Sequence, residues 1–141
     1  MDSYGAFIHD YIVERYTVDI EAHTLSMETR PEDPARQPRV SLKFHGLLAH
    51  HFEDVIGCNI LLDLNEGSAE DFTARSHDFL MQHIPYGFPI LNLPYVYPLK
   101  SEDLKQLPQI LRRDGYHIFE LSASLGLTGF VIAKGLNVVN Q

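Results

Sequence analysis

The sequence has little cysteine and no tryptophan. Its single cysteine in 141 residues, Cys58, excludes an internal disulfide. Cys58 opens the mainly apolar run of residues 58–62, where a cysteine usually serves as a small buried apolar side chain. No neighbour in sequence would stabilise a thiolate there. We therefore predict that Cys58 is buried and unreactive.

Long uncharged stretches free of proline are also absent, which excludes a membrane-spanning helix. The longest uncharged stretch, residues 84–99, contains four prolines that would break such a helix. The beginning of the chain lacks the basic stretch and apolar core of a secretory signal. These absences predict a cytoplasmic protein without membrane contact.

Positive charge is scarce as well. Nineteen Asp and Glu stand against eleven Lys and Arg, which gives a formal net charge of −8. An acidic surface repels phosphate backbones, so nucleic acid is not an expected partner. The same field would hasten encounter with a basic protein, although many acidic proteins are charged only for solubility.

What the sequence does contain is alternation of apolar and polar residues, the period of a half-buried strand. Residues 21–23 are typical of a turn, so the strands on either side of them should form a hairpin. Gly46 should mark a bulge or bend after a long strand. Strands are predicted at residues 7–13, 16–20, 25–28, 40–45, 58–64, 119–124 and 130–133.

Two segments have helical periodicity instead. Ser68 followed by Asp71 is typical of a capped helix start, and apolar residues then recur at helical spacing up to Ile84. The second segment starts at Ser101, and Pro108 should kink it or restart it as a second short helix.

The order of these elements predicts the fold class. Few strand–helix–strand units alternate, so we expect a single α+β domain over residues 1–141. Its sheet should be largely antiparallel, with about five to seven strands. The two helices should lie between the fifth strand region and a C-terminal hairpin.

Standard catalytic and nucleotide-binding motifs are missing. The sequence has no Gly-x-Ser-x-Gly, no Gly-x-x-x-x-Gly-Lys and no Gly-x-Gly-x-x-Gly. We therefore expect no cofactor, and the balance is against an enzyme.

Eight histidines make metal binding the main enzymatic alternative. His45, His50 and His51 lie near two carboxylates, and imidazole and carboxylate are ligands for zinc or iron. On a regular strand, His50 and His51 point to opposite faces and cannot both bind one ion. His45 and His51 could share a face but would lie about 20 Å apart on an extended strand, and a bend at Gly46 would change both their relative facing and their distance. A small metal-dependent or histidine-based hydrolase using these three residues, with His9 as a further candidate, therefore stays the alternative function.

Residues 86–98 are unusually rich in proline and aromatic residues, including Tyr86, Phe88, Tyr95 and Tyr97. One interpretation is a loop that packs over an end of the sheet as part of the core. If these side chains are exposed instead, the patch would indicate a protein partner or a homodimer, because tyrosine is favoured at interfaces.

The N-terminal half has a "His-Asp, strand, Asp-turn, strand, Phe-x-Gly" layout, carried by residues 7–11, 16–19, 24–29, 40–47 and 49–52. This layout resembles a group of small uncharacterised bacterial proteins, over roughly residues 5–66. Some similar-looking families are immunity proteins, which bind and block a cognate bacterial toxin. The resemblance implies a binding protein, and it carries no catalytic residue over to this sequence.

Together these observations predict a non-enzymatic protein-binding or regulatory domain, of an immunity-like kind, with a basic protein as its partner. We expect the contact surface at Glu66, Glu70 and Asp71, or at the aromatic residues of the segment from Tyr86 to Tyr97.

Overall fold

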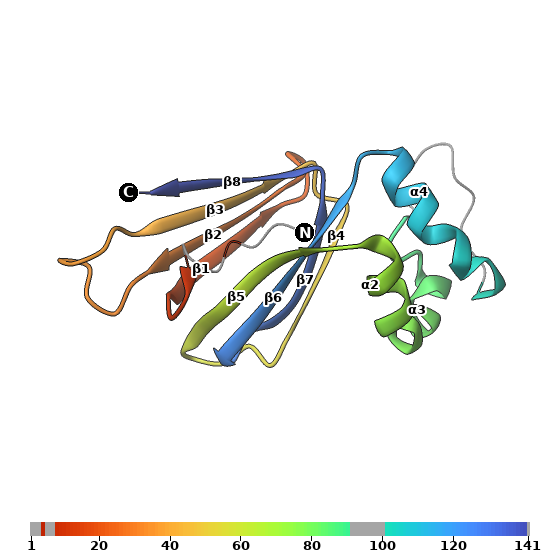
Figure 1. The fold of residues 1–141 in the computed structure, drawn as a ribbon. Helices are drawn as coiled ribbons and strands as arrows, with labels where there is room; N and C mark the ends of the chain where they lie inside the picture. The colour runs from red at the N-terminus through yellow and green to blue at the C-terminus, as the bar shows by residue number, and fades with distance from the viewer. Residues whose placement is uncertain (1–3, 5–7, 91–100, 141) are drawn as a thin grey trace.

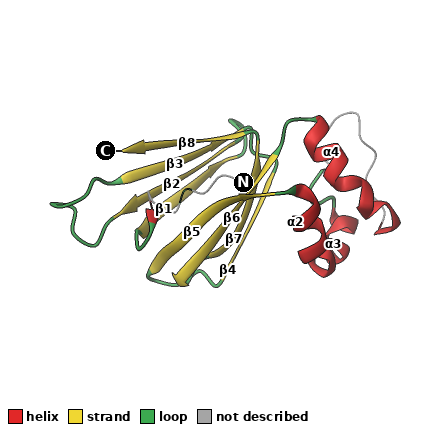
Figure 2. Cartoon of the chain, viewed as in Figure 1, coloured by secondary structure: helices red, strands yellow, loops and turns green. Residues whose placement is uncertain are grey.

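The computed structural model describes Tyr4, residues 8–90 and residues 101–140. These residues form an eight-stranded sheet with a layer of three short α-helices at one end (Figure 1; Figure 2). The strands are β1 (Ile12–Asp19), β2 (Thr24–Arg30), β3 (Val40–His45), β4 (Ala49–Glu53), β5 (Asn59–Gly67), β6 (His117–Leu125), β7 (Thr128–Ala133) and β8 (Gly135–Asn140). The helices are α2 (Ala69–Arg75), α3 (His77–His83) and α4 (Leu107–Arg113), with 3₁₀-helices η1 (Ile84–Tyr86) and η2 (Ser101–Gln106).

The predicted α+β class with an antiparallel sheet is confirmed, but the predicted counts of strands and helices are wrong. The described residues form eight strands rather than five to seven, and three α-helices rather than two. β8 has no clear apolar–polar alternation, so its sequence does not predict a strand. The predicted helix up to Ile84 divides at Ser76, whose backbone (φ −99°, ψ 19°) leaves the helical conformation.

The sheet has the strand order β4-β7-β6-β5-β1-β2-β3-β8, with each neighbouring pair antiparallel. β7 continues into β8 after the single residue Lys134, although the two strands stand at opposite ends of this order. The sheet therefore folds over, so that its two ends come close to each other where β7 joins β8. In Figure 1 this places the half made of β1, β2, β3 and β8 over the half made of β4, β7, β6 and β5.

Two bends that lie side by side make this folding of the sheet possible. Gly46 follows β3 in the left-handed conformation (φ +61°), and Lys134 separates β7 from β8. The backbone N–H of Lys134 donates to the carbonyl oxygens of His45 (3.0 Å) and Gly46 (3.2 Å). A Cβ at Gly46 would lie 2.7 Å from Lys134 Cβ, so only glycine fits. The predicted bend at Gly46 is confirmed.

The main core lies between the two halves of the sheet. The predicted alternation is confirmed at β2, where Leu25 and Met27 are fully buried, and at β3, where Leu42 and Phe44 are. Phe44 packs against Phe119 of β6 with ring centroids 5.4 Å apart. This core also takes in Ile8, Tyr11, Val40, Leu61, Leu64, Leu121, Leu127, Val131 and Ala133.

A second core lies between the helices and the outer face of β6 and β7. Residues 68–90 and 101–116, which come between the antiparallel neighbours β5 and β6 in the sequence, supply its helical side. The Ser68 side chain accepts a hydrogen bond from Asp71 N (3.0 Å), and Pro108 lies in the first turn of α4, where a proline is tolerated. The predicted helix start at Ser68 and the restart at Pro108 are therefore confirmed, whereas the segment that begins at Ser101 is a 3₁₀-helix up to Gln106 rather than an α-helix. The buried members of this core are Phe72, Leu80, Ile84, Ile90, Leu104, Leu107, Ile110, Leu111, Ile118, Phe130 and Ile132.

Cys58 is exposed, which corrects the prediction of a buried thiol. β5 begins one residue later, so Cys58 belongs to the loop that precedes the strand. Asn59 fixes that loop, because its side chain bonds to the backbone of Ile56 and accepts from Leu127 N (3.0 Å). In the part of the chain that the structure describes, no helix is long and apolar enough to span a bilayer.

Candidate functional site

A cleft of about 470 Å³ lies where the helical layer meets the sheet. Its volume is in the range of about 300–1,000 Å³ that is usual for ligand sites. The sheet provides one wall, from β4, β5, β6 and β7, and helices α2 and α3 with the Ser76 link provide the other. The lining residues are His51, Glu53, Asn65, Phe72, Arg75, Ser76, Phe79, Glu120, Leu121, Ser122, Thr128, Gly129 and Phe130.

The sheet wall is built from a row of side chains that crosses four strands. His51 on β4 is opposite Phe130 on β7, Phe130 is opposite Glu120 on β6, and Glu120 is opposite Asn65 on β5. Directly opposed residues in an antiparallel sheet project from the same face. Glu53 and Thr128 are also opposite each other. Each lies two residues along its strand from His51 or Phe130, so this pair projects from the same face and continues the wall. We call this surface the polar floor.

The change from core to polar floor follows the alternation of β6 and β7. Ile118 and Ile132, which are paired with each other, are buried under the helices. Glu120 and Phe130 are the next pair on the same face, each two residues along its strand from Ile118 or Ile132. The short helical layer covers the first of these rows. In the second row it packs on Phe130 but leaves Glu120 partly exposed, so the cleft opens beside Glu120.

The helical wall is aromatic. Phe79 of α3 has its ring centroid 4.4 Å from that of His51 and 5.8 Å from that of Phe130, and Phe72 of α2 packs edge-on against Phe130 at 4.7 Å. The rings of His83 and Phe88 extend the cluster around Phe79, with centroids 4.2 and 5.5 Å from that of Phe79. Rigid rings on one side and polar groups on the other give the cleft two chemically different walls.

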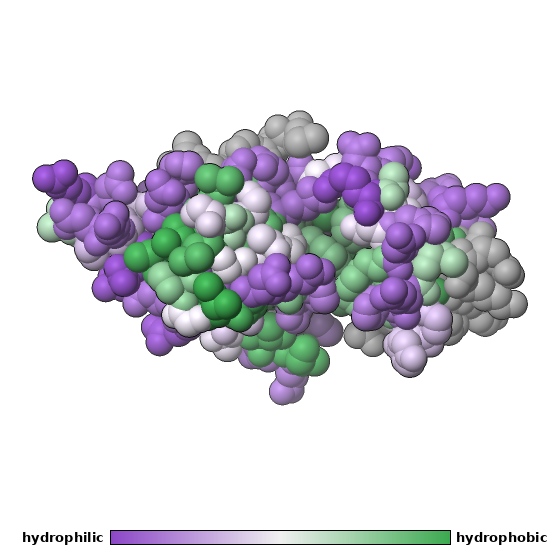
Figure 3. All heavy atoms as spheres, turned by 90° about the horizontal axis from the view of Figure 1, so that it is seen from below, coloured by the Kyte–Doolittle hydropathy of each residue, from purple (hydrophilic) through white to green (hydrophobic). Residues whose placement is uncertain are grey.

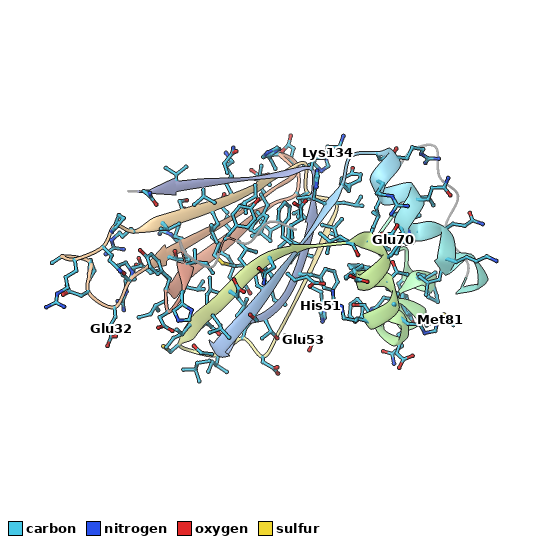
Figure 4. The ribbon with its side chains drawn as sticks, in the orientation of Figure 1. Glu32, His51, Glu53, Glu70, Met81 and Lys134 are labelled. Atoms are coloured by element: carbon cyan, nitrogen blue, oxygen red, sulfur yellow. The ribbon has the colours of Figure 1, made fainter. Side chains whose placement is uncertain are left out.

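Two ion pairs lie within the cleft. Arg75 Nη2 on α2 donates to Glu120 Oε1 on β6 at 2.5 Å, and so bridges the helical layer and the floor. His51 Nε2 lies 3.0 Å from Glu53 Oε1 on the same strand. Figure 4 shows His51 and Glu53 on the part of the sheet nearest to α2 and α3, with Glu32 at the opposite end of the molecule.

Gly129 allows the two strands of the floor to approach closely. Its φ of +154° and its position opposite Phe52 bring its Cα against the β4 backbone. A Cβ at this position would lie 1.9 Å from the carbonyl oxygen of His51. The backbone that presents His51 to the cleft therefore depends on glycine at position 129.

The predicted acidic contact residues lie beside the cleft rather than in it. Glu66 contacts His117 of β6, and Glu70 pairs with Arg112 of α4, so the charge of Glu70 is compensated by an arginine of the chain itself. Asp71 is exposed in the first turn of α2.

The predicted aromatic contact residues divide into two groups. Tyr86 is 85% exposed, whereas Phe88 is half-buried and packs on the second core. The core interpretation therefore holds for Phe88, and the exposed-patch interpretation holds for Tyr86. Tyr95 and Tyr97 lie outside the described residues.

The three candidate metal-ligating histidines lie in different surroundings. The His51 ring faces the cleft, while His50 lines a separate small pocket with Tyr86 and Phe88. The His45 ring lies against Gly135, where an added Cβ would be 2.4 Å from His45 Nε2. Among residues 8–90 and 101–140, no group of three or more His, Cys, Asp or Glu side chains is placed to hold a metal ion.

His50 also differs from the other histidines in its electrostatics. Burial, with a smaller contribution from the neighbouring His51, lowers the pKa of His50 from its ordinary value. A neutral imidazole is therefore favoured there in the folded protein.

Sequence reasoning missed the cleft because its residues are far apart in the chain. Arg75, Phe79, Glu120 and Phe130 come from two helices and two strands that meet only through the sheet register. Glu53 is noticeable in the sequence only as a neighbour of the histidines. A usable signal is the face of β6 that carries Ile118, because Glu120, Ser122 and Ser124 follow on the same face and predict a polar surface there.

Comparison with known proteins finds no matching family model, no matching curated protein and no matching solved structure. The likeness in layout to immunity proteins therefore stays a prediction.

Proposed function

We propose that this chain is a non-enzymatic binding domain whose partner is a basic protein. The observation that carries the proposal is the charge of residues 46–83. They contain seven Asp and Glu and one Arg, a net charge of −6 within a chain total of −8. These residues form β4, β5, α2 and α3, the elements around the cleft. Such a concentrated field steers a basic surface toward one end of the molecule.

An apolar surface near the acidic one supports the same proposal. Figure 3, which views the molecule from below, shows a group of apolar atoms in the middle of the sheet half, with hydrophilic atoms toward its outer end. Val55, Ile56, Leu62 and Leu125, from the β4–β5 loop and the neighbouring strands β5 and β6, are between 41 and 51% exposed. Protein interfaces combine apolar contact area with charged groups that fix the register.

The layout that resembles immunity proteins fits this proposal, because those proteins act by occupying a partner rather than by chemistry. On that basis we extend the proposal to an immunity-like role, in which the domain blocks a basic region of another protein.

The proposal is tested with a short fluorescein-labelled peptide of alternating arginine and serine, and a matched peptide of glutamate and serine. Fluorescence anisotropy should show binding of the basic peptide only, weakening strongly between about 0.05 and about 0.5 M NaCl because screening shortens the range of the field. Equal affinity for both peptides, or no binding of either, would contradict the proposal.

Charge-matched variants then locate the surface. Neutralising three exposed acids near the cleft should weaken binding of the basic peptide more than neutralising three exposed acids elsewhere. An equal effect of the two sets would exclude this end of the molecule as the contact surface. The first set is Asp54→Asn, Asp71→Asn and Asp78→Asn, and the second is Asp10→Asn, Glu21→Gln and Glu32→Gln.

One contact favours a second candidate, the histidine-based hydrolase. His51 is oriented by Glu53 at 3.0 Å in a cleft that also holds the hydroxyl groups of Ser122 and Thr128. Within the described residues, however, no serine or threonine hydroxyl hydrogen-bonds to His51. Hydrolysis of p-nitrophenyl acetate that disappears in His51→Ala would favour this candidate. If the protein hydrolysed p-nitrophenyl acetate no faster than buffer does, the hydrolase candidate would be refuted and the binding function would remain.

A further inference from the structure

We propose that the cleft takes one arginine side chain of the partner, with its guanidinium between the carboxylates of Glu53 and Glu120. This inference rests on the proposed function and names the group that the partner inserts. Three features of the cleft carry it: an internal guanidinium contact, a carboxylate without a permanent cation, and an aromatic wall.

The first feature is the pair between Arg75 and Glu120, which shows that the floor accommodates a guanidinium. Arg75 reaches Glu120 from across the cleft at 2.5 Å. Glu120 is held on β6 with only 27% of its side chain exposed, whereas the Arg75 side chain is 58% exposed. The carboxylate is therefore the fixed member of the pair, and the arginine is the member that can be exchanged or shared.

The second feature is Glu53, whose charge is not neutralised by a permanent cation. Its partner is His51 at 3.0 Å, and no Lys or Arg of the described chain pairs with it. The Glu53 side chain is 59% exposed, so an incoming cation can reach it without displacing anything. Glu53 and Glu120 both belong to the polar floor, next to His51 and Phe130 respectively.

The third feature is the aromatic wall. Phe79 is partly exposed and packs over both His51 and Phe130, with its ring nearly perpendicular to that of Phe130 (88°). A guanidinium is planar and weakly hydrated, so it packs well against the exposed part of such a ring. The stem of three methylene groups would lie along the same exposed part of Phe79.

These features favour arginine over lysine. A guanidinium presents several N–H groups in one plane, so it can donate to a carboxylate with two bonds while it stacks on a ring. An ammonium group is compact and strongly hydrated, and it has no flat surface to pack against an aromatic ring. The cleft also offers the hydroxyl oxygens of Ser122 and Thr128 as acceptors for the remaining N–H groups.

The test compares the arginine–serine peptide with a lysine–serine peptide of the same length and charge. For the wild-type protein we expect the arginine peptide to bind about tenfold more tightly in fluorescence anisotropy. Glu53→Gln and Phe79→Leu should each reduce or abolish this preference, and they should weaken the arginine peptide more than the lysine peptide. Glu32→Gln, at the far end of the molecule, is the matched control and should leave both affinities unchanged.

The outcomes separate this inference from the proposed function. If both basic peptides bind equally, and Glu53→Gln acts no more strongly than Glu32→Gln, the arginine site is refuted while binding of a basic partner stands. If neither peptide binds, the proposed function itself fails. Thermal unfolding of each variant shows whether a lost preference reflects a lost fold, and the ratio of the two affinities is insensitive to a smaller folded fraction.

Discussion

The core between the two halves of the sheet and the core under the helices differ in how much each can stand alone. The first is enclosed by strands in register, with fully buried residues such as Leu42 and Phe44. The second is covered by three α-helices of seven residues each. Isolated helices shorter than about 12–15 residues are marginal in water, so these helices depend on packing against Ile118, Phe130 and Ile132.

This difference matters for the cleft, which has one wall from each region. The polar floor belongs to the sheet and should be rigid. The aromatic wall belongs to the helical layer and should open more easily, because local unfolding starts where tertiary support is least. The predictions below test whether the two regions really differ in this way.

The largest effect is expected in the sheet core. Phe44→Ala removes a ring that is fully buried against Phe119, and should lower the free energy of unfolding by about 3–5 kcal/mol. Urea denaturation should show one transition shifted as a whole. A loss below about 1 kcal/mol would mean that the sheet core tolerates the cavity and is not the structural centre.

Phe72→Ala is the matched change in the helical layer. Phe72 is 1% exposed and packs against Phe130, so we expect a loss of about 3 kcal/mol that is confined to this layer. Hydrogen exchange should speed up for amides of residues 69–90 and 104–113 while β2 and β3 stay protected. Equal acceleration in the strands would show that the two cores unfold together.

Gly129→Ala tests the floor itself. The added Cβ would meet the His51 carbonyl, and the positive φ is unfavourable for alanine, so we expect a loss of more than about 1 kcal/mol. Amides of β4 should lose exchange protection first. Gly115→Ala is a useful comparison, because its φ is also positive (+79°) but nothing lies within 4 Å of the added Cβ. If Gly129→Ala were no less stable than Gly115→Ala, the close approach of β7 to β4 would not be the reason that position 129 requires glycine.

The smallest effect concerns pH. Burial, then the charge of His51, lowers the pKa of His50 from 6.5 in the folded protein, so the unfolded chain binds this proton more readily. The resulting contribution to stability is present above about pH 6.5 and is lost as the pH falls through the lower folded pKa. His50→Asn should therefore flatten the decline in unfolding free energy between neutral and acidic pH, measured by urea denaturation at several pH values. An unchanged decline in the His50 variant would contradict the assigned burial effect.

Sequence alone could predict the elements whose pattern is local. The alternation of Leu25 with Met27 and of Leu42 with Phe44, the capping of α2 by Ser68 and the restart at Pro108 all depend on residues a few positions apart. β8 was not predictable in this way. Its run of Asn and Val has no distinct period, and it becomes a strand by pairing with β3.

The candidate site was less accessible to prediction than the fold. The cleft requires His51, Phe130 and Glu120 to stand in one row, which depends on the registers of β4, β7 and β6. The interruption at Ser76, which places Phe79 over this row, is equally a result of packing. Only the acidic excess of residues 46–83 could be read without the structure.

The measurement that tests the binding site most directly is a titration of ¹⁵N-labelled protein with the arginine–serine peptide, followed by ¹H–¹⁵N correlation spectra. The largest shift changes should fall on amides of the cleft, at His51, Glu53, Ser76, Glu120 and Thr128. Amides of β2, β3 and β8 should stay in place. Changes concentrated on those three strands, or spread evenly over the molecule, would show that the cleft is not where a basic partner binds.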